Sequence, residues 1–282
     1  MKRLLVGFQG EHGAYSEQAI KRFLGNDHET VPFRSFPEML RAVEDERVDN
    51  AILPVENSLA GTVMPAYDAL MNCSLLVQAE IISRVEHCLM APAETVFADV
   101  KYAISHHQAL AQCSNNLLSL GIEPREYYDT AGAAKDLAAN KTPGTAAIAS
   151  ELAAETYGLT ILKRNLEDLK INYTRFFLMG REAVKCSGRC KTSIIFTTQH
   201  LPGALYRVLG ELSNRALNMT KIESRPSRRE MWHYLFFVGF EGAIGDRNVD
   251  EALEAIERQC SYFKLLGSYP AAEAPKIVDD SV

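Results

Sequence analysis

The sequence predicts an α/β protein with two folding units, and three observations support this prediction. Along the first part of the chain, short apolar strands are repeatedly followed by polar residues and then by helices, which indicates an open, mainly parallel sheet system with covering helices. The last part runs strand, helix, strand, strand, helix, strand, which is the ferredoxin-like order. At 282 residues the chain is also long for one core and fits two or three folding units.

The composition narrows the classes of partner. A hydrophobic content of 47%, a charged content of 23% and a net charge of -6 are those of an ordinary folded protein. The acidic balance argues against a nucleic acid or a membrane surface as partner. The first apolar run, residues 4–8, ends before a signal peptide could form, and no other stretch is apolar for long enough to cross a bilayer. We therefore expect a cytoplasmic protein.

The cysteines are scattered along the chain, and only Cys186 and Cys190 lie close together. No second pair of cysteines or histidines stands at the spacing of a zinc finger, so we expect no structural zinc and no other metal or cofactor. We also expect reduced thiols, which are the rule in the cytosol.

A glycine-rich loop follows the first predicted strand, residues 4–8. Gly7, Gly10 and Gly13 recur at regular spacing, and a helix with an apolar stripe comes next. This spacing matches neither the dinucleotide-binding fingerprint nor a P-loop, which excludes a nucleotide site of either type. A glycine loop at the start of a helix can still present backbone N–H groups to an anion.

Polar residues stand at the carboxyl ends of four further predicted strands, where they precede helices. These residues are Glu56-Asn57-Ser58, Ser105-His106-His107-Gln108, Asp129-Thr130 and Ser150. Each of them can be a plain helix cap, as can Ser35 in the capping box Ser35-Phe36-Pro37-Glu38. Taken together they indicate a cleft, because ligands of such sheets bind beyond the carboxyl ends of the strands. The apolar run 80–90 is where we expect the chain to cross to a second lobe.

The stretch 172–180 is the centre of the predicted site. From Phe176 it is apolar enough for a buried strand, and Thr174 and Arg175 stand at its entrance, where we expect both to face the cleft. Arg175 offers a planar fork of donors to a carboxylate, and Thr174 offers a hydroxyl. The alternative is a surface strand end with a solvated arginine.

The C-terminal part begins after a short polar segment, residues 181–191, which reads as an interdomain linker. Its helix opens at Pro202-Gly203, and a turn is expected at residues 225–229. Gly203 would let the carboxylate of a small ligand approach the helix N–H groups, although it can also be an ordinary helix-start glycine. Residues 270–282 read as a loose tail.

Five motifs, in one order along the chain, resemble those of prephenate dehydratase. They are Gly10-x-x-Gly13-x-x-Ser16, Val55-Glu56-Asn57-Ser58-x-x-Gly61-x-Val63, Ser105-His106-x-Gln108-Ala109-Leu110-x-Gln112-Cys113, Asp129-Thr130-Ala131 and Thr174-Arg175-Phe176. The last 80 or so residues resemble the ACT regulatory module of that family.

One departure from the family pattern is His107, which stands where the family usually has proline. It is either a titratable ring beside the cleft or an exposed helix-start residue.

The resemblance implies a domain plan. It implies a two-lobed catalytic domain of the periplasmic-binding-protein type at residues 1–182, with lobe one at about 1–78 plus 160–182 and lobe two at about 79–159. An ACT domain of βαββαβ order is expected at residues 192–271, and no chorismate mutase segment in front. A homodimer or homotetramer formed through the ACT domain is implied as well.

The resemblance also implies a reaction, the loss of carbon dioxide and water from prephenate to give phenylpyruvate, with L-phenylalanine as feedback effector. Arogenate, which carries an amino group instead of the keto group, and a non-catalytic metabolite sensor remain alternatives. We expect Arg175 to clamp a carboxylate, and Thr174 to hydrogen-bond the leaving oxygen with a proton relayed from Glu56 or His106.

The site residues that the resemblance implies fall into three groups. The catalytic group is Thr174, Arg175, Phe176, Glu56, Asn57, Ser58, Ser105, His106, Gln108 and Gln112; the substrate-binding group is Gly10, Ser16, Gly61, Thr62, Asp129 and Thr130; the allosteric group is Gly203, Ala204, Leu205, Glu223, Ser224, Arg225 and Pro226.

Overall fold

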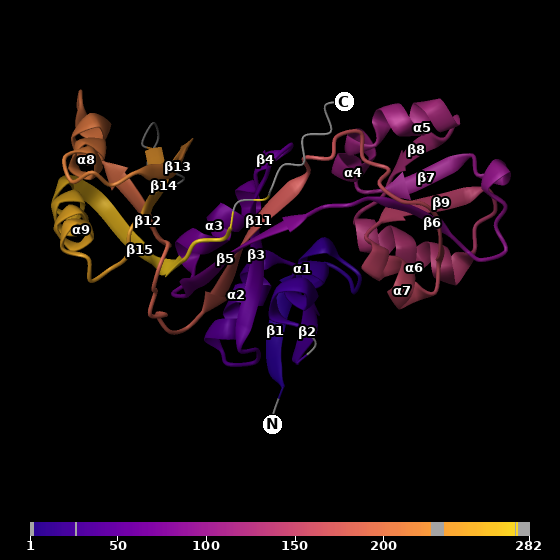
Figure 1. The fold of residues 1–282 in the computed structure, drawn as a ribbon, viewed down its shortest axis with the longest axis horizontal. Coiled ribbons are helices and arrows are strands. Elements are labelled where there is room, and N and C mark those ends of the chain that lie inside the picture. Colours follow the sequence, from indigo (N-terminus) through magenta and orange to yellow (C-terminus); the bar gives the residue numbers. More distant parts are fainter. Residues whose placement is uncertain (1–2, 26, 227–233, 274, 276–282) are drawn as a thin grey trace. The chain divides into compact units, whose positions relative to one another are not determined.

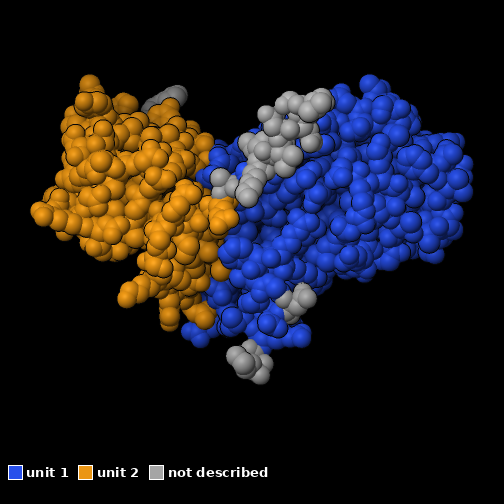
Figure 2. All heavy atoms as spheres, in the orientation of Figure 1, with its two compact units in different colours: residues 1–73, 81–177, 274–282 blue, residues 74–80, 178–273 orange. Residues whose placement is uncertain are grey.

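The computed structural model describes residues 3–25, 27–226, 234–273 and 275 (Figure 1). The chain forms two compact units, shown in different colours in Figure 2. Residues 1–73 and 81–177 belong to the first unit, and residues 74–80 and 178–273 to the second.

The first sheet has the strand order β2-β1-β3-β11-β5, with the short β4 paired to β3. Strand β1 is parallel to both of its neighbours, β2 and β3. The chain leaves β1 to one side and returns to the other, so a ligand crevice is expected at the carboxyl ends of β1 and β3. The elements of this region are β1 (Leu4–Gln9), α1 (Tyr15–Leu24), β2 (His28–Phe33), α2 (Phe36–Glu44), β3 (Asn50–Asn57), β4 (Gly61–Thr62), α3 (Met64–Asn72), β5 (Leu76–Arg84) and β11 (Tyr173–Gly180).

The second sheet has the order β10-β6-β9-β7-β8, and β7 lies parallel to both β8 and β9. The strand order of this sheet reverses in the same way: the chain goes from β7 to β8 on one side and then to β9 on the other. The elements are β6 (Cys88–Ala91), η1 (Phe97–Asp99), β7 (Tyr102–Ser105), α4 (His107–Gln112), α5 (Ser114–Leu120), β8 (Glu123–Glu126), α6 (Thr130–Asn140), β9 (Thr145–Ala149), α7 (Glu151–Tyr157) and β10 (Thr160–Lys163).

Alternation along the strands of the second sheet explains why helices cover both of its faces. Leu89 and Ile148 belong to one buried cluster, together with residues of α4 and α5. Met90 and Ala147 point the other way and pack with residues of α6 and α7. The two pairs of helices lie on opposite sides of this sheet in Figure 1. The predicted α/β class, with parallel strands and covering helices, is confirmed.

The lobe boundaries differ from those expected from the sequence. Strand β10 pairs with β6, so residues 160–163 belong to the second lobe and not to the first. Strand β5 belongs to the first sheet, so residues 81–84, which are part of the first unit, stay in the first lobe. The chain crosses between the sheets at residues 85–87 and again at 164–172, and the backbone N–H of Val85 donates to the carbonyl of Asn172 at 2.8 Å between these crossings. The expected crossing within residues 80–90 is confirmed.

Helix boundaries follow the local signals in the sequence. Ser35, Asp129 and Ser150 each accept a hydrogen bond from a backbone N–H in the first turn of their helix. Gly121 and Gly158 end helices in the left-handed conformation. The helical stretch before Gly121 is interrupted at Cys113 and forms α4 and α5.

The second unit contains a four-stranded antiparallel sheet in the order β13-β14-β12-β15, with two helices. Its elements are β12 (Cys190–Thr198), α8 (Ala204–Ser213), β13 (Met219–Pro226), β14 (Tyr234–Glu241), α9 (Arg247–Gln259) and β15 (Cys260–Pro270). The predicted ferredoxin-like order is therefore confirmed. Phe196 and Phe240 of the sheet pack with Val208 of α8 and Ile256 of α9 in one buried cluster.

Two expectations about the C-terminal part concern a turn and a tail that lie partly outside the described residues. Arg225 and Pro226 continue strand β13, where a turn was expected, and the remainder of that turn lies outside the described residues. Most of the tail expected at residues 270–282 also lies outside them. No helix in the described part of the chain is long and apolar enough to span a bilayer.

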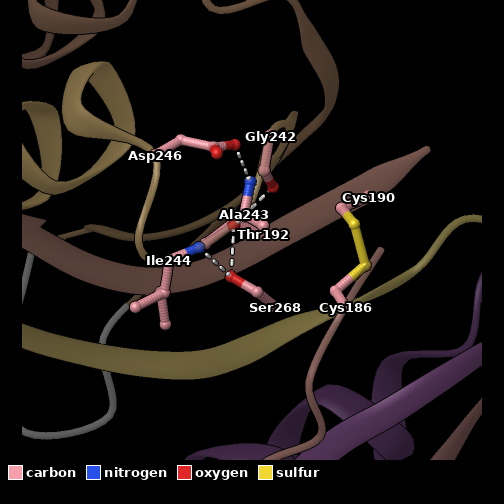
Figure 3. The surroundings of a disulfide bond; sticks show 8 residues. All are labelled: Cys186, Cys190, Thr192, Gly242, Ala243, Ile244, Asp246 and Ser268. Atoms are coloured by element: carbon pink, nitrogen blue, oxygen red, sulfur yellow. Dashed lines mark hydrogen bonds between the residues drawn. A yellow bond between two sulfur atoms is a disulfide. The ribbon is translucent and has the colours of Figure 1, made fainter. Parts of the chain in front are cut away.

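The expectation of reduced thiols is wrong at one pair, because Cys186 and Cys190 form a disulfide (Figure 3). Their close spacing was visible in the sequence, but the fold of the segment that brings the sulfur atoms together was not. Beside the disulfide, Thr192 donates a hydrogen bond to the carbonyl of Gly242 at 2.8 Å and shares one of 2.6 Å with Ser268. Ser268 also accepts from the backbone N–H of Ile244 at 3.0 Å, so these buried hydroxyls are satisfied.

Candidate active site

A cavity of about 530 Å³ lies in the first unit and is lined by residues of both lobes. It sits where the switches of strand order place a ligand crevice, since Gln9 ends β1, Asn57 ends β3 and His106 follows β7. The predicted residues that line it are Ser16, Asn57, Gly61, Thr62, His106, Gln108, Gln112, Asp129, Thr130, Thr174 and Phe176. The predicted residues that do not are Gly10, Glu56, Ser58, Ser105 and Arg175.

Asn57 is held in one orientation by the backbone that follows it. Its Oδ1 accepts hydrogen bonds from the N–H groups of Leu59 at 3.0 Å and Ala60 at 2.9 Å. The amide nitrogen Nδ2 must therefore face the other way, where it donates to Oδ1 of Asn172 at 2.8 Å and to Oγ1 of Thr174 at 3.1 Å. It also lies 3.2 Å from the carbonyl of Tyr173. These hydrogen bonds hold the end of β3 and the hydroxyl of Thr174 in a fixed relative position.

The hydroxyl of Thr174 is directed by this contact. Because Oγ1 accepts from Asn57, the hydrogen of the hydroxyl is left to be donated elsewhere. No other residue in the described part of the chain accepts it, and Thr174 is 9% exposed and lines the cavity. A ligand in the cavity is the partner that this geometry leaves for the Thr174 hydrogen.

The expectation that Arg175 faces the cleft beside Thr174 is not met. Successive residues of a strand point to opposite faces, so Thr174 and Phe176 line the cavity while Arg175 points away from it. The Arg175 guanidinium pairs with the carboxylate of Glu56 at 3.3 Å. Neither residue lines the cavity, so this geometry supports neither a carboxylate clamp by Arg175 nor a proton relay from Glu56.

Two serines of the predicted catalytic group use their hydroxyls within the protein. Ser105 is fully buried and donates to the carbonyl of Ile148 at 2.6 Å. Ser58 donates to the carbonyl of Ile171 at 2.5 Å and accepts from the N–H of Tyr173 at 2.9 Å. Both hydroxyls fasten chain segments to one another and face no ligand in the cavity.

The amides of the glycine loop are likewise occupied. Gly10 donates to the carbonyl of Phe33 at 2.9 Å, and Gly13 donates to the carboxylate of Glu17 at 2.6 Å. Glycine is needed at Gly13, where φ is +86° and a Cβ would lie 2.6 Å from Cα of Ala153. The N-cap residue of helix α1, Ala14, makes no side-chain cap, and the first residues of that helix, Tyr15 and Ser16, line the cavity. Backbone N–H groups at such a helix start can receive an anion.

The cavity contains no fixed positive charge, since no lysine or arginine is among the described residues that line it. An anion there would meet the uncapped N-terminus of α1, that of α3 and neutral side chains such as Gln108 and Gln112. Such groups hold a carboxylate without pairing it to a full charge.

The titratable groups of the cavity are shifted toward their neutral forms. Burial raises the pKa of Asp129 above its ordinary value, although hydrogen bonds from Gly132 and Ala131 oppose this. Burial, followed by the nearby ring of His107, lowers the pKa of His106. His106 Nδ1 accepts from the N–H of Gln108 at 3.4 Å, so a neutral His106 carries its hydrogen on Nε2.

The interpretation of His107 as an exposed helix-start residue is confirmed, because it is the first residue of α4 and is exposed. Its ring centroid lies 4.1 Å from that of His106.

Replacing His107 by proline removes one of the two effects that depress the pKa of His106, and proline is well tolerated in the first position of a helix. We expect the pKa of His106 to rise toward its ordinary value, as measured by NMR titration. His107→Gln is the control that removes the charge and keeps the backbone N–H. An unchanged pKa of His106 in both variants would show that the two rings do not interact.

Sequence reasoning missed three polar residues of the site. Tyr15 and His87 line the cavity, and Asn172 contacts Asn57 and Gln112. His87 and Asn172 are buried, at 2% and 0% exposure, in the two crossings between the lobes. The signal in the sequence was a histidine inside an apolar run and an asparagine directly before the Tyr173-Thr174 entrance.

A second cavity, of about 390 Å³, lies in the second unit at the start of α8. Gly203, Ala204 and Leu205 line it, and Gly203 has a φ of +77°. The other four predicted allosteric residues do not line this cavity. Glu223, Ser224, Arg225 and Pro226 lie in β13 and pair with β14.

A two-lobed α/β domain with a polar cavity at its switch points, followed by a ferredoxin-like module, defines a class of small-molecule enzyme with a regulatory domain. The chain belongs to the prephenate dehydratase family. The family model for prephenate dehydratase matches residues 6–184, and that for the ACT domain matches residues 192–258. The recognition from sequence motifs is confirmed, and with it dehydratase activity of the prephenate/arogenate type.

Three similar proteins illustrate the relationship. Arogenate dehydratase/prephenate dehydratase 2 of Arabidopsis thaliana, a chloroplastic protein, is 40% identical over 95% of this chain and 73% of its own. The structure of prephenate dehydratase from Arthrobacter aurescens in complex with L-Phe is 29% identical, with a TM-score of 0.88 over 96% and 93% of the two chains. The structure of GqqA, described as a novel type of quorum-quenching acylase, is 34% identical, with a TM-score of 0.87 over 95% and 98%.

Proposed function

We propose that the chain catalyses the decarboxylating dehydration of prephenate to phenylpyruvate in the cavity of the first unit. The observation that carries this proposal is the hydroxyl of Thr174, which accepts from Asn57 and therefore offers its hydrogen to the cavity. The substrate is a cyclohexadiene with two carboxylates and a ring hydroxyl, so it needs one donor at the leaving oxygen and a cavity that accepts negative charge.

The lack of lysine and arginine in the described lining of the cavity suits this reaction. A fixed cation on the departing carboxylate would stabilise the substrate more than the transition state, since that carboxylate loses its charge as carbon dioxide forms. The uncapped N-terminus of α1 and amide side chains hold the substrate by weaker hydrogen bonds. Aromatisation of the ring then drives the loss of both groups.

The leaving oxygen departs as water, and the reaction consumes one proton overall. Thr174 hydrogen-bonds this oxygen as negative charge develops on it, and a contact of that kind typically contributes about 10²- to 10³-fold in rate. Phe176, from the same face of β11, lines the cavity and supplies apolar contact for the ring. We assign the remaining lining residues predicted above, among them Asn57, Gln108, Gln112 and Asp129, to substrate binding and orientation.

The test mixes purified protein with prephenate and follows the absorbance of phenylpyruvate, with chelator present. We expect turnover that is independent of added metal. Binding of prephenate without product would instead identify a metabolite sensor.

Arogenate is the alternative substrate, because the Arabidopsis relative is named for both dehydrations. Parallel assays with prephenate and arogenate at equal concentration decide between them by the ratio of kcat/KM. A ratio in favour of arogenate would replace prephenate in the proposal and leave the role of Thr174 unchanged.

Acylase chemistry, suggested by the description of GqqA, needs a nucleophile activated by a neighbouring base. The Thr174 hydroxyl accepts from an amide nitrogen, and burial raises the pKa of the Cys113 thiol far above its ordinary range. Neither is prepared as a nucleophile, so we favour dehydration. An N-acyl amide substrate, assayed by release of its free amine, should give no product.

We propose that residues 1–182 carry out catalysis and that the ACT domain, residues 192–271, binds L-phenylalanine as feedback inhibitor. The Arthrobacter relative was solved with L-Phe bound, and the cavity at α8 offers helix N–H groups to a carboxylate. Glu223 to Pro226 do not line this cavity, so we assign them to the same site from a partner subunit in a homodimer or homotetramer.

Gly203→Ala tests the effector site. Its φ of +77° is strained for any residue with a Cβ, and the added atom stands beside the helix start that would receive the carboxylate. We expect inhibition by L-phenylalanine to weaken about tenfold, which corresponds to about 1.4 kcal/mol. Turnover without phenylalanine should stay at the wild-type level. Gly210→Ala, at a position in α8 where a Cβ meets open space, is the matched control. Unchanged inhibition in Gly203→Ala would place the effector elsewhere.

A further inference from the structure

An unbroken chain of hydrogen bonds leads from Tyr15 to Thr174 and joins both lobes. The hydroxyl of Tyr15 lies 2.6 Å from Nδ1 of His87, and Nε2 of His87 lies 2.8 Å from Oε1 of Gln112. Asn172 donates to the same Oε1 at 2.9 Å, and Asn57 connects Asn172 to Thr174. The chain therefore ends at the hydroxyl assigned to the leaving oxygen.

The direction of every bond in this chain follows from its anchored end. Backbone N–H groups occupy Oδ1 of Asn57, so Nδ2 of Asn57 donates and Oδ1 of Asn172 accepts. The other end of the Asn172 amide must then be its nitrogen, which donates to Oε1 of Gln112. Because Oε1 is an acceptor, Nε2 of His87 must donate to it.

His87 is thereby restricted to one tautomer. Burial lowers the pKa of His87, which favours the neutral ring with a single hydrogen. That hydrogen is on Nε2, so Nδ1 accepts and the one hydrogen of the Tyr15 hydroxyl is donated to it, rather than to the carbonyl of Glu86 at 3.4 Å. The backbone N–H of His87 donates to the buried carboxylate of Glu167 at 2.9 Å, which holds the residue in place.

The same reasoning identifies a second donor. With Oε1 of Gln112 occupied by His87 and Asn172, the nitrogen Nε2 of Gln112 has no acceptor among the residues that the structure describes. Gln112 lines the cavity, as Thr174 does. A reversed Gln112 amide would place its NH₂ group against the NH₂ group of Asn172, so a donor at His87 Nε2 keeps it in the productive orientation.

We propose that His87, present as the Nε2–H tautomer, is a positioning residue that together with Asn172 holds the Gln112 amide so that Gln112 and Thr174 both donate to the substrate. The expected changes in kcat and KM rest on the proposed dehydration, whereas the tautomer of His87 does not depend on it. Tyr15 contacts the other ring nitrogen of His87, Nδ1, and Asn172 donates to the same Gln112 oxygen as His87 does.

Two substitutions distinguish the roles of the two ring nitrogens of His87. In His87→Gln the amide nitrogen reaches about as far as Nε2 and can donate to Gln112, whereas in His87→Asn the shorter amide can serve only as a partner for Tyr15. We expect kcat to fall less than tenfold in His87→Gln and about 100-fold in His87→Asn. KM should change little in the first variant and rise in the second, since Gln112 loses its orientation there.

A merely structural role would give a different result. Both substitutions shorten or open a buried ring, so equal losses of kcat that follow the loss in Tm would overturn the proposal. Tyr15→Phe supplies a third comparison, because it removes the donor to Nδ1 of His87 without touching Gln112.

The tautomer itself is measured by long-range ¹⁵N NMR of protein labelled at histidine, with His87→Gln used to assign the signal. We expect protonated Nε2 and unprotonated Nδ1 in the wild type, and also in Tyr15→Phe, because Oε1 of Gln112 still faces Nε2 there. A wild-type ring protonated at Nδ1 would refute the proposal. This readout needs no substrate, so it stands even if the protein turns over neither prephenate nor arogenate.

Discussion

Thr174→Ala is expected to lower kcat about 10²- to 10³-fold while the protein remains folded and KM changes little. The substitution removes the Thr174 hydroxyl. Among the described residues of β11, it is the only hydroxyl whose hydrogen is directed into the cavity. The contact forms fully only when charge develops on the leaving oxygen, so its loss acts on turnover more than on binding. Steady-state kinetics with prephenate give both constants.

Thr174→Ser is the matched variant, since it keeps the hydroxyl and the hydrogen bond from Asn57 and removes only a methyl group. We expect it to retain most of the activity, with a Tm close to that of Thr174→Ala. Turnover near the wild-type level in Thr174→Ala would remove this residue from the reaction.

Asn57→Asp is expected to have an effect of at least similar size, although it replaces only the amide NH₂ group by an oxygen. The oxygen that still faces Leu59 and Ala60 keeps its two hydrogen bonds. The other oxygen faces acceptors where Nδ2 donated, at Asn172 and at the carbonyl of Tyr173. Unmatched buried polar groups typically cost about 1–3 kcal/mol of stability.

The catalytic effect of Asn57→Asp comes from Thr174. Its hydroxyl would turn to donate to the new carboxylate, and its hydrogen would be withdrawn from the leaving oxygen. We expect kcat to fall about 10³-fold or more. It should recover in part as pH falls, because the protonated carboxyl group of this variant carries a hydrogen where Nδ2 of Asn57 stood.

The control for the added charge is Asn140→Asp, at an exposed position at the end of α6. It should leave both kcat and Tm nearly unchanged. If Asn57→Asp retained turnover similar to this control, the directed hydrogen bond to Thr174 would have no catalytic role.

Local chemistry made much of the fold predictable. Ser35, Asp129 and Ser150 cap helices as expected, and the elements of the C-terminal unit follow one another as predicted. Caps and periodicity act between residues that are neighbours in the sequence, so the sequence alone carries the information. The gathering of polar strand ends at one cavity was predictable too, because parallel strands end at one edge of their sheet.

The role of individual polar side chains could not be predicted in this way. Arg175 and Thr174 are adjacent in the sequence, yet the pleat of β11 sends them to opposite faces. Ser105 was predicted in the catalytic group, but its hydroxyl donates to a carbonyl on the neighbouring strand. The amides of Gly10 and Gly13 are likewise occupied, by Phe33 and Glu17.

By itself the sequence determined the family, the α/β class and the set of strand ends that surround the cavity. Only the tertiary structure decided which of those groups still have a hydrogen to donate. Asn57 directs Thr174 across 117 residues of sequence, and Gln112 is directed by His87 and Asn172, which are 25 and 60 residues away. A donor is free only when every partner around it is known, and these partners meet only where the chain crosses between the lobes.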